Sequence, residues 1–246
     1  QVYEQEMPAD WQEKDILRIT AFAVGEGDAL LLQCGGESMM VDGGPKPFRD
    51  PMKEAMEKRG ISHFKYLLNT HSHDDHIDGL YYLMLNGFTA DEYLHPYTEW
   101  WARADKALHG RTIKLTEKLG IPNRQVGEGD TLTLGSAKLA LHRYTKVNNT
   151  NAKSLLTKVT FGSATALLCA DITGRAQKGF LTQLEPEELK ADVIKIPHHG
   201  ITPVEPDFLT AVSPSFAVVT KYADEKRLSK LMIQLEGRGI PHYFSG

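Results

Sequence analysis

The segment 71–76, which reads H-x-H-x-D-H, constrains this chain more than any other part of its 246 residues. It places five imidazole or carboxylate groups within six residues, directly after the apolar run 64–69. Such side chains bind divalent zinc and similar metals. Because His71 and His73 would point one way and Asp75 and His76 another, the segment suits two neighbouring metals better than one. The alternative is a polar surface loop that is rich in histidine.

Three other apolar segments end in groups of the same chemistry. Residues 38–44 run into Asp42, residues 164–171 end in Asp171, and residues 191–200 end in the pair His198 and His199. Each segment reads as a strand. Side chains that converge from the ends of several strands build a rigid metal site on a sheet. The four strand ends together predict a metal centre.

These motifs resemble those of metallo-β-lactamase-fold hydrolases, and most of all the soluble domain of ComEC/Rec2-type competence proteins. Residues 24–29 (VGEGDA) resemble that group's DVGQGDA opening, and residues 41–44 (VDGG) its DGG motif. Residues 70–80 (THSHDDHIDGL) resemble its THxHxDHxGGL motif, residues 168–171 (LCAD) its LTGD motif and residues 196–200 (IPHHG) its PHHGS motif. The resemblance covers the chain from about residue 16 to its C-terminus.

The resemblance implies an α/β fold, the metallo-β-lactamase-type αββα four-layer sandwich. Residues 1–15 are expected to be a lead-in segment, and residues 16–246 a single hydrolase domain. The sequence departs from the group's motifs at five positions: Ala23, Glu26, Asp78, Ala170 and Ile201. None of these departures removes a metal-binding side chain, so they bear on substrate contacts more than on metal binding.

The resemblance also implies a ligand assignment. His71 and His73 would bind one metal, Asp75 and His76 a second, and Asp171 would bridge the two. His199 would complete the second metal, because it directly precedes the glycine, while His198 would contact substrate or donate a proton. Asp42 would bind a ligand histidine and fix its tautomer.

A further histidine that many superfamily members supply to the first metal has no clear counterpart here. His142 and the polar run 148–151 are the candidates, and Ser154 resembles a serine of the ComEC-like group. The site is therefore expected to hold one or two divalent metals, zinc first, with manganese or iron as alternatives.

The expected chemistry is hydrolysis. Two metals about 3.5–4 Å apart lower the pKa of a bridging water and supply a hydroxide nucleophile, which Asp75 or Asp171 can orient. The resemblance implies a phosphodiester substrate, either a small molecule or a nucleic acid. An amide or ester hydrolase, including a β-lactamase, and a non-catalytic module that retains the metals are the alternatives.

Composition limits the partners. The net charge of −4 does not suggest a general nucleic-acid binder, which is usually basic. Cys34 and Cys169 lie in apolar runs and are expected to be buried free thiols. No apolar run is long enough to span a bilayer. The first residue is Gln1, which is compatible with export after removal of a leader and equally with a trimmed or incomplete terminus.

The periodicity predicts the elements that carry these motifs. Lone histidines at 95, 109 and 242 are expected to be structural or exposed. Strands are expected at 16–24, 29–34, 38–42, 64–69, 131–142 with a turn at Gly135, 155–169 with a turn at Gly162, 193–196, 216–220 and 242–244, and helices at 49–60, 77–85, 100–119, 206–212 and 225–236.

Overall fold

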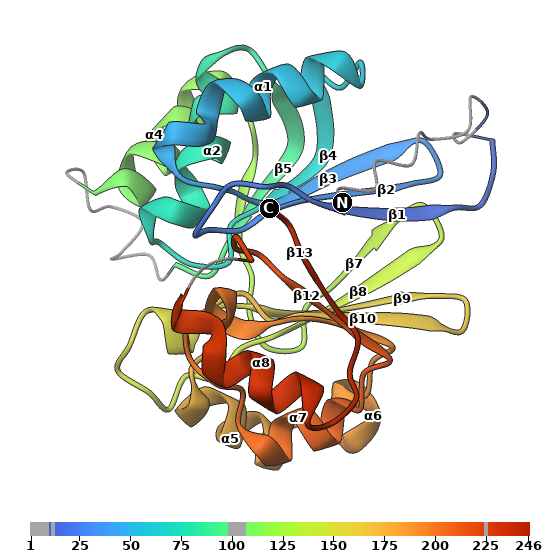
Figure 1. Ribbon diagram of the computed structural model, residues 1–246. Coiled ribbons are helices and arrows are strands. Elements are labelled where there is room, and N and C mark those ends of the chain that lie inside the picture. Colours follow the sequence, from blue (N-terminus) through green and yellow to red (C-terminus); the bar gives the residue numbers. More distant parts are fainter. Residues whose placement is uncertain (1–9, 11–12, 98–106, 224–225) are drawn as a thin grey trace. The chain divides into compact units, whose positions relative to one another are not determined.

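The computed structural model describes residues 10, 13–97, 107–223 and 226–246 (Figure 1). The chain divides into two compact units. The first consists of Gln1–Val126 with Thr133–Ser136, and the second of Gly127–Leu132 with Ala137–Gly246. The expected lead-in at residues 1–15 lies largely outside the described residues. No helix in the described ranges is long and apolar enough to cross a membrane.

The first unit is built on a six-stranded sheet of order β1-β2-β3-β4-β5-β6, counted over the described residues. The first three strands pair antiparallel, and β3, β4, β5 and β6 pair parallel. The strands are β1 (Leu17–Ala21), β2 (Ala29–Cys34), β3 (Glu37–Gly43), β4 (His63–Leu68), β5 (Thr89–His95) and β6 (Asn123–Gln125).

Among the described residues, three helices cover one side of this sheet: α1 (Arg49–Lys58), α2 (Asp74–Leu85) and α4 (Leu108–Leu119) (Figure 1). Apolar side chains of β2, β3 and β4 pack against those of the helices in one core, which includes Leu31, Met40, Met56, Phe64 and Leu80. All six residues of β2 are buried, which agrees with its largely apolar sequence, ALLLQC.

The second unit is built on a sheet of order β13-β12-β11-β10-β9-β8-β7, again over the described residues. Strands β10 to β13 pair parallel, and β8, β9 and β10 pair antiparallel. The strands are β7 (Thr131–Leu134), β8 (Ala137–His142), β9 (Leu156–Phe161), β10 (Ala164–Leu168), β11 (Val193–Lys195), β12 (Phe216–Val219) and β13 (His242–Phe244).

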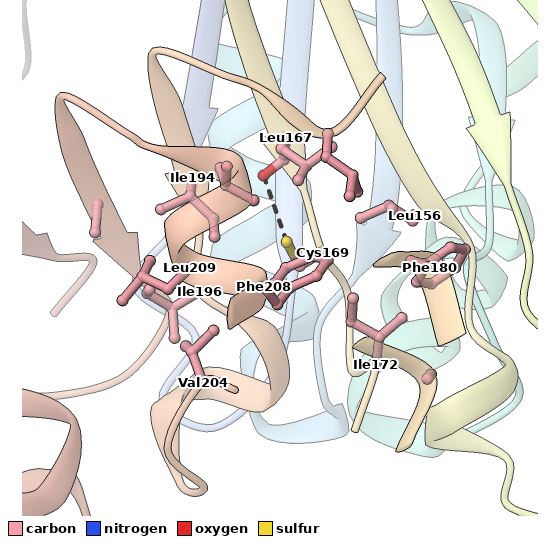
Figure 2. Packing of buried hydrophobic residues seen from close by; sticks show 14 of the residues in the cluster. Leu156, Leu167, Cys169, Ile172, Phe180, Ile194, Ile196, Val204, Phe208 and Leu209 are labelled. Carbon is pink, nitrogen blue, oxygen red and sulfur yellow. Dashed lines mark hydrogen bonds between the residues drawn. The ribbon is translucent and has the colours of Figure 1, made fainter. Parts of the chain in front are cut away.

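Helices α5 (Gly174–Gln183), α6 (Pro186–Leu189), α7 (Pro206–Val212) and α8 (Ser229–Glu236) accompany this second sheet. Figure 2 shows the core of the unit, where Leu167, Ile194 and Phe208 pack around Cys169. The Cys169 thiol donates to the carbonyl of Leu167 at 3.8 Å. Both Cys34 and Cys169 are buried and free, as the sequence predicts.

The helix that carries the histidine motif begins earlier than predicted. Helix α2 begins at Asp74 rather than at Ile77, so His76 lies on the helix and not in a loop. Asp74 and Asp75 occupy its first turn, where negative charge is favourable because the helix dipole is positive there. The predicted helix 100–119 is described only from Leu108, since residues 98–106 lie outside the described residues. It ends, as predicted, at Leu119, and the following Gly120 has a φ of 70°.

Parallel pairing brings the site-bearing strand ends together within each unit. In the first unit, Val41 of β3 pairs with Leu68 of β4, so Asp42 lies beside Asn69. In the second, Leu168 of β10 pairs with Lys195 of β11. Each unit therefore has an acidic residue at or just after the end of one strand and histidines after its parallel neighbour.

Candidate metal centre

Three histidine rings lie against one another at the end of β4, and we call His71, His73 and His76 the histidine cluster. The ring centroids of His71 and His76 are 4.1 Å apart, and those of His71 and His73 are 4.8 Å apart. His71 and His76 are buried. His71 follows the strand, His73 precedes α2 and His76 lies on its first turn.

Asp42 fixes the histidine cluster through contacts with His76 and with Thr70, the residue before His71. One carboxylate oxygen contacts Nδ1 of His76 at 2.7 Å and accepts a bond from the Thr70 hydroxyl at 2.6 Å. The other accepts bonds from the Asn69 amide and the Thr70 backbone N–H, each at 2.8 Å. A carboxylate with this many donors is fixed in place, and its contact with Nδ1 of His76 directs Nε2 of that ring away from Asp42.

The backbone supports this arrangement at two positions. Asp42 has a φ of 57°, a left-handed conformation that few non-glycine residues adopt and that clusters at functional sites. Next to it, Gly43 and Gly79 are in direct backbone contact, because a Cβ on Gly79 would lie 1.8 Å from the Gly43 carbonyl oxygen. These glycines let α2 approach the end of β3 closely enough for His76 to reach Asp42.

The acidic residues around the cluster have different surroundings. Asp75 lies with its Oδ2 3.7 Å from Nε2 of His76, whereas Asp74 is exposed. Asp78, which stands where the ComEC-like motif has glycine, is buried and forms a bidentate ion pair with Arg49. That bond raises the pKa of Arg49 above its ordinary value.

The second unit carries the other predicted residues. Oδ1 of Asp171 lies 3.2 Å from Nε2 of His199, and its Oδ2 lies 3.9 Å from Nε2 of His198. Nδ1 of His199 contacts the hydroxyl of Thr220 at 3.1 Å. Nδ1 of His199 is thus held by Thr220, at the end of a neighbouring strand, while Nε2 is directed at the Asp171 carboxylate.

The loops that hold Asp171 and the two histidines are strained. Ala170, His198 and His199 have φ values of 43°, 51° and 52°. The buried Lys195 donates to the Ala170 carbonyl at 2.9 Å, and His198 donates its backbone N–H to the same oxygen at 2.9 Å. These bonds stabilise a left-handed backbone that would otherwise be costly.

Contacts from the polar segment before β9 complete this half of the site. The Asn151 amide lies 3.0 Å from Nε2 of His198, and Ser154 Oγ accepts the backbone N–H of Asp171 at 3.2 Å. His142, one candidate for the missing ligand, instead pairs with Glu128 at 3.1 Å. The polar segment, rather than His142, reaches the predicted site residues of its own unit.

The donor sets of the two units fit a divalent metal. In the first unit, ligand atoms of Asp42, His71 and His76 lie within 4.8 Å of one another. Asn69 contacts Asp42, Lys195 contacts the carbonyl of Ala170, and Thr220 contacts His199, because parallel strands end side by side. No pattern in the sequence marks these three supporting residues. Buried imidazole and carboxylate groups that converge in this way bind transition metals.

Residues 23–208 match the family model of the metallo-beta-lactamase superfamily. The chain belongs to this superfamily. The solved structure of the metallo-beta-lactamase fold protein YhfI from Bacillus subtilis is similar, at 15% identity, 94% coverage of this chain, 96% coverage of YhfI and a TM-score of 0.61. The α/β sandwich fold expected from the sequence is thereby confirmed.

Two other solved structures are similar to most of this chain. Zn²⁺-bound PqqB from Methylobacterium extorquens is 12% identical, with coverage of 94% of this chain and 98% of PqqB and a TM-score of 0.59. CmlA, a diiron beta-hydroxylase from Streptomyces venezuelae, is 14% identical over 92% of this chain, with a TM-score of 0.57. This chain spans about half of CmlA, 52% of its length. At these identities the likeness shows the fold alone, and no curated protein matches the sequence.

Proposed function

We propose that this superfamily member is a metal-dependent hydrolase of phosphodiesters, of the ComEC/Rec2 type. The observation that carries the proposal is the histidine cluster at the end of β4, with Nδ1 of His76 bound to the buried Asp42. A carboxylate behind a histidine fixes the tautomer that a metal requires and raises the basicity of the ligand nitrogen. An exposed histidine-rich loop, the alternative interpretation, would not need a buried carboxylate bound to one of its histidines.

The sequence motifs supply the proposed ligands. His71 and His73 would bind one metal, and Asp75, His76 and His199 would bind a second. Asp171 would serve both metals, because a carboxylate has lone pairs for two cations. Zinc is the first expectation, with manganese and iron as alternatives. Proteins of the same fold include the Zn²⁺-bound PqqB and the diiron CmlA, so the fold itself accommodates both kinds of metal.

Divalent metals bound there would lower the pKa of a coordinated water to about 7 and offset charge on the attacked phosphoryl group. The chain's own residues do the rest. Asp75 and Asp171 accept hydrogen bonds from the attacking water and so orient it. His198 donates a proton to the leaving oxygen, which is the step that a general acid accelerates.

Asn151 suits His198 to this role. Its amide lies 3.0 Å from Nε2 of His198. A side-chain amide can present either its NH₂ group or its oxygen after a half-turn, so it can face an unprotonated or a protonated ring nitrogen. Asn151 can therefore keep His198 in place before and after proton transfer.

The substrate class follows from the resemblance and the charge. The ComEC-like motifs favour a phosphodiester, while the net charge of −4 disfavours tight, unspecific binding of nucleic acid, which depends on many phosphate contacts. A small phosphodiester therefore remains as strong a candidate as a nucleic acid.

The test is a substrate screen of protein loaded separately with zinc, manganese or iron, using bis-p-nitrophenyl phosphate, nitrocefin and a thioester. We expect turnover of the diester that a chelator abolishes and that added metal restores. Asp74→Asn is a matched control for variants of the site, because Asp74 belongs to the same motif but is exposed. Preference for nitrocefin or the thioester would identify an amide or ester hydrolase, and a metal-loaded protein that turns over none of the three would be a binding module.

A further inference from the structure

A further acidic side chain of the first unit lies beside the histidine cluster. Asp28 stands at the end of the loop that precedes β2, and only 1% of it is exposed. One of its carboxylate oxygens lies within 4.8 Å of a ring nitrogen of His76. In the sequence Asp28 belongs to the VGEGDA motif and carries no metal-binding signal of its own.

The loop before Asp28 is fixed against the backbone of the histidine motif. Gly27 has a φ of 149°, and a Cβ at this position would lie 2.6 Å from the Asp75 carbonyl oxygen and 2.9 Å from Cδ of Pro45. On the other side, Gly44 donates its backbone N–H to the Asp28 carbonyl at 2.8 Å. The backbone around Asp28 is thus held by residues close in sequence to Asp42 and His76. These contacts fix the position of the Asp28 carboxylate relative to both side chains.

The electrostatics of this corner favour a cation. His76 has Asp42 on its Nδ1, at 2.7 Å, and Asp75 3.7 Å from its Nε2. Asp28 adds a further carboxylate near the same ring, and it is buried. Buried carboxylates that lie close together repel one another and are costly to desolvate unless a positive charge compensates them. A divalent cation on the Nε2 side of His76 would supply that compensation.

We infer that Asp28 is a ligand of the metal on the His76 side, an inference that rests on the proposed metal centre. The first unit then offers this metal two carboxylates and one imidazole: Asp28, Asp75 and His76. Carboxylate oxygens suit manganese and ferrous iron, whereas imidazole also suits zinc. The site beside His76 is therefore expected to bind manganese or iron more readily than the site beside His71 and His73 does.

The test compares Asp28→Asn with Asp74→Asn in the full chain. Both changes remove one negative charge, but Asp28 is buried and Asp74 is exposed. Metal-free protein is titrated with Mn²⁺ and with Zn²⁺ by calorimetry, and the Tm of each metal-free variant is measured. Loss of a group that supports a metal typically weakens binding about 10–100-fold, so we expect Asp28→Asn to lose at least about tenfold in Mn²⁺ affinity while Asp74→Asn matches the wild type.

Three outcomes are distinguishable. If Asp28→Asn binds both metals as tightly as the wild type, the inference is wrong, and a lower Tm of its metal-free form would mark Asp28 as structural. If the wild type itself binds neither metal, the proposed metal centre fails before Asp28 is in question. Asp28→His is the second variant, to be used also if Asp28→Asn does not fold: it exchanges a carboxylate for an imidazole, so the ratio of Zn²⁺ to Mn²⁺ affinity should rise at least about tenfold. An unchanged ratio would also overturn the inference.

Discussion

Asp42 and His76 are joined by a 2.7 Å contact between a carboxylate oxygen and Nδ1, and both side chains are fully buried. Asp42 belongs to β3 and His76 to α2, so the contact ties the sheet to the helix that carries the histidine motif. It also decides which nitrogen of His76 faces outward from the sheet end. The properties of the site should therefore be sensitive to Asp42 even if this residue never touches a metal.

Asp42→Asn tests that role with little change in shape. Asparagine, like aspartate, tolerates the left-handed φ of 57° found here, so the backbone should be preserved. The neutral amide cannot raise the basicity of His76 in the same way, and we expect metal affinity to fall about 10–100-fold. Titration of metal-free protein measures this. Affinity equal to that of the wild type would mean that Asp42 only supports the fold.

Tyr97→Phe probes the next layer behind Asp42. The Tyr97 hydroxyl donates to Oδ1 of Asn69, whose amide donates to Asp42. All of these groups are buried, so loss of the hydroxyl should lower the free energy of unfolding by about 1–3 kcal/mol. Tyr82→Phe is the control, since Tyr82 donates to Asp50 at an exposed position, where loss of the hydroxyl should change stability far less. If chemical denaturation shows equal losses in the free energy of unfolding for the two variants, the Tyr97 hydroxyl does not stabilise the buried hydrogen bonds of Asn69 and Asp42.

Gly79→Ala tests the close approach of α2 to β3. In an ordinary helix interior this change would stabilise by about 1 kcal/mol, because alanine is the better helix former. Here the new methyl group would collide with the Gly43 carbonyl, and we expect a net loss of about 1–3 kcal/mol instead. Gly127→Ala is the control, as nothing lies within 4 Å of its Cβ position. A stabilised Gly79→Ala protein would show that the helix can move away without cost.

The strand ends could be predicted because each apolar run stops at a polar group that stands out in the sequence. Strand β5 was not predicted: its sequence, TADEYLH, includes the charged residues Asp91 and Glu92, although its second half is fully buried between β4 and β6. Helix α5 was missed for a different reason. Gly174 and Gly179 argue against a helix, yet a Cβ on Gly179 would lie 2.3 Å from the Tyr144 ring, so packing rather than propensity selects glycine.

The site shows the same division. His71, His76, Asp171 and His199 belong to recognisable motifs, so the sequence could propose them. Thr220, which contacts Nδ1 of His199, lies 21 residues away, directly after the next parallel strand, and no local pattern marks it. Contacts made across parallel strands depend on register, which a single sequence does not reveal.

The buried His95 should make stability depend on pH. Burial, and to a lesser degree the nearby His109, lowers the pKa of His95 from 6.5 to about 4, while a bond to Asn123 opposes the shift. Between these two values the unfolded chain binds the proton and the folded protein does not, so stability is complete above pH 6.5 and falls as the pH drops toward 4. The slope from this residue is at most about 1.4 kcal/mol per pH unit. Denaturation midpoints of His95→Gln should fall less steeply across this window; parallel curves would assign the slope to other groups.

His199 and His198 should separate in their effects on metal binding and activity. Nε2 of His199 lies 3.2 Å from Asp171 and its ring is held from behind by Thr220, whereas Nε2 of His198 is 3.9 Å from Asp171 and meets the Asn151 amide. We therefore expect His199→Ala to lower metal occupancy, measured by elemental analysis, more than His198→Ala does. His198→Ala should keep its metal and lose about 100-fold or more in diester hydrolysis, as expected for a general acid. Asp171→Ala should lose at least about a hundredfold, because the nucleophile depends on the bridging carboxylate. If His198→Ala empties the site while His199→Ala leaves it full, the two roles are reversed, and full activity of Asp171→Ala would refute the assignment of the whole site.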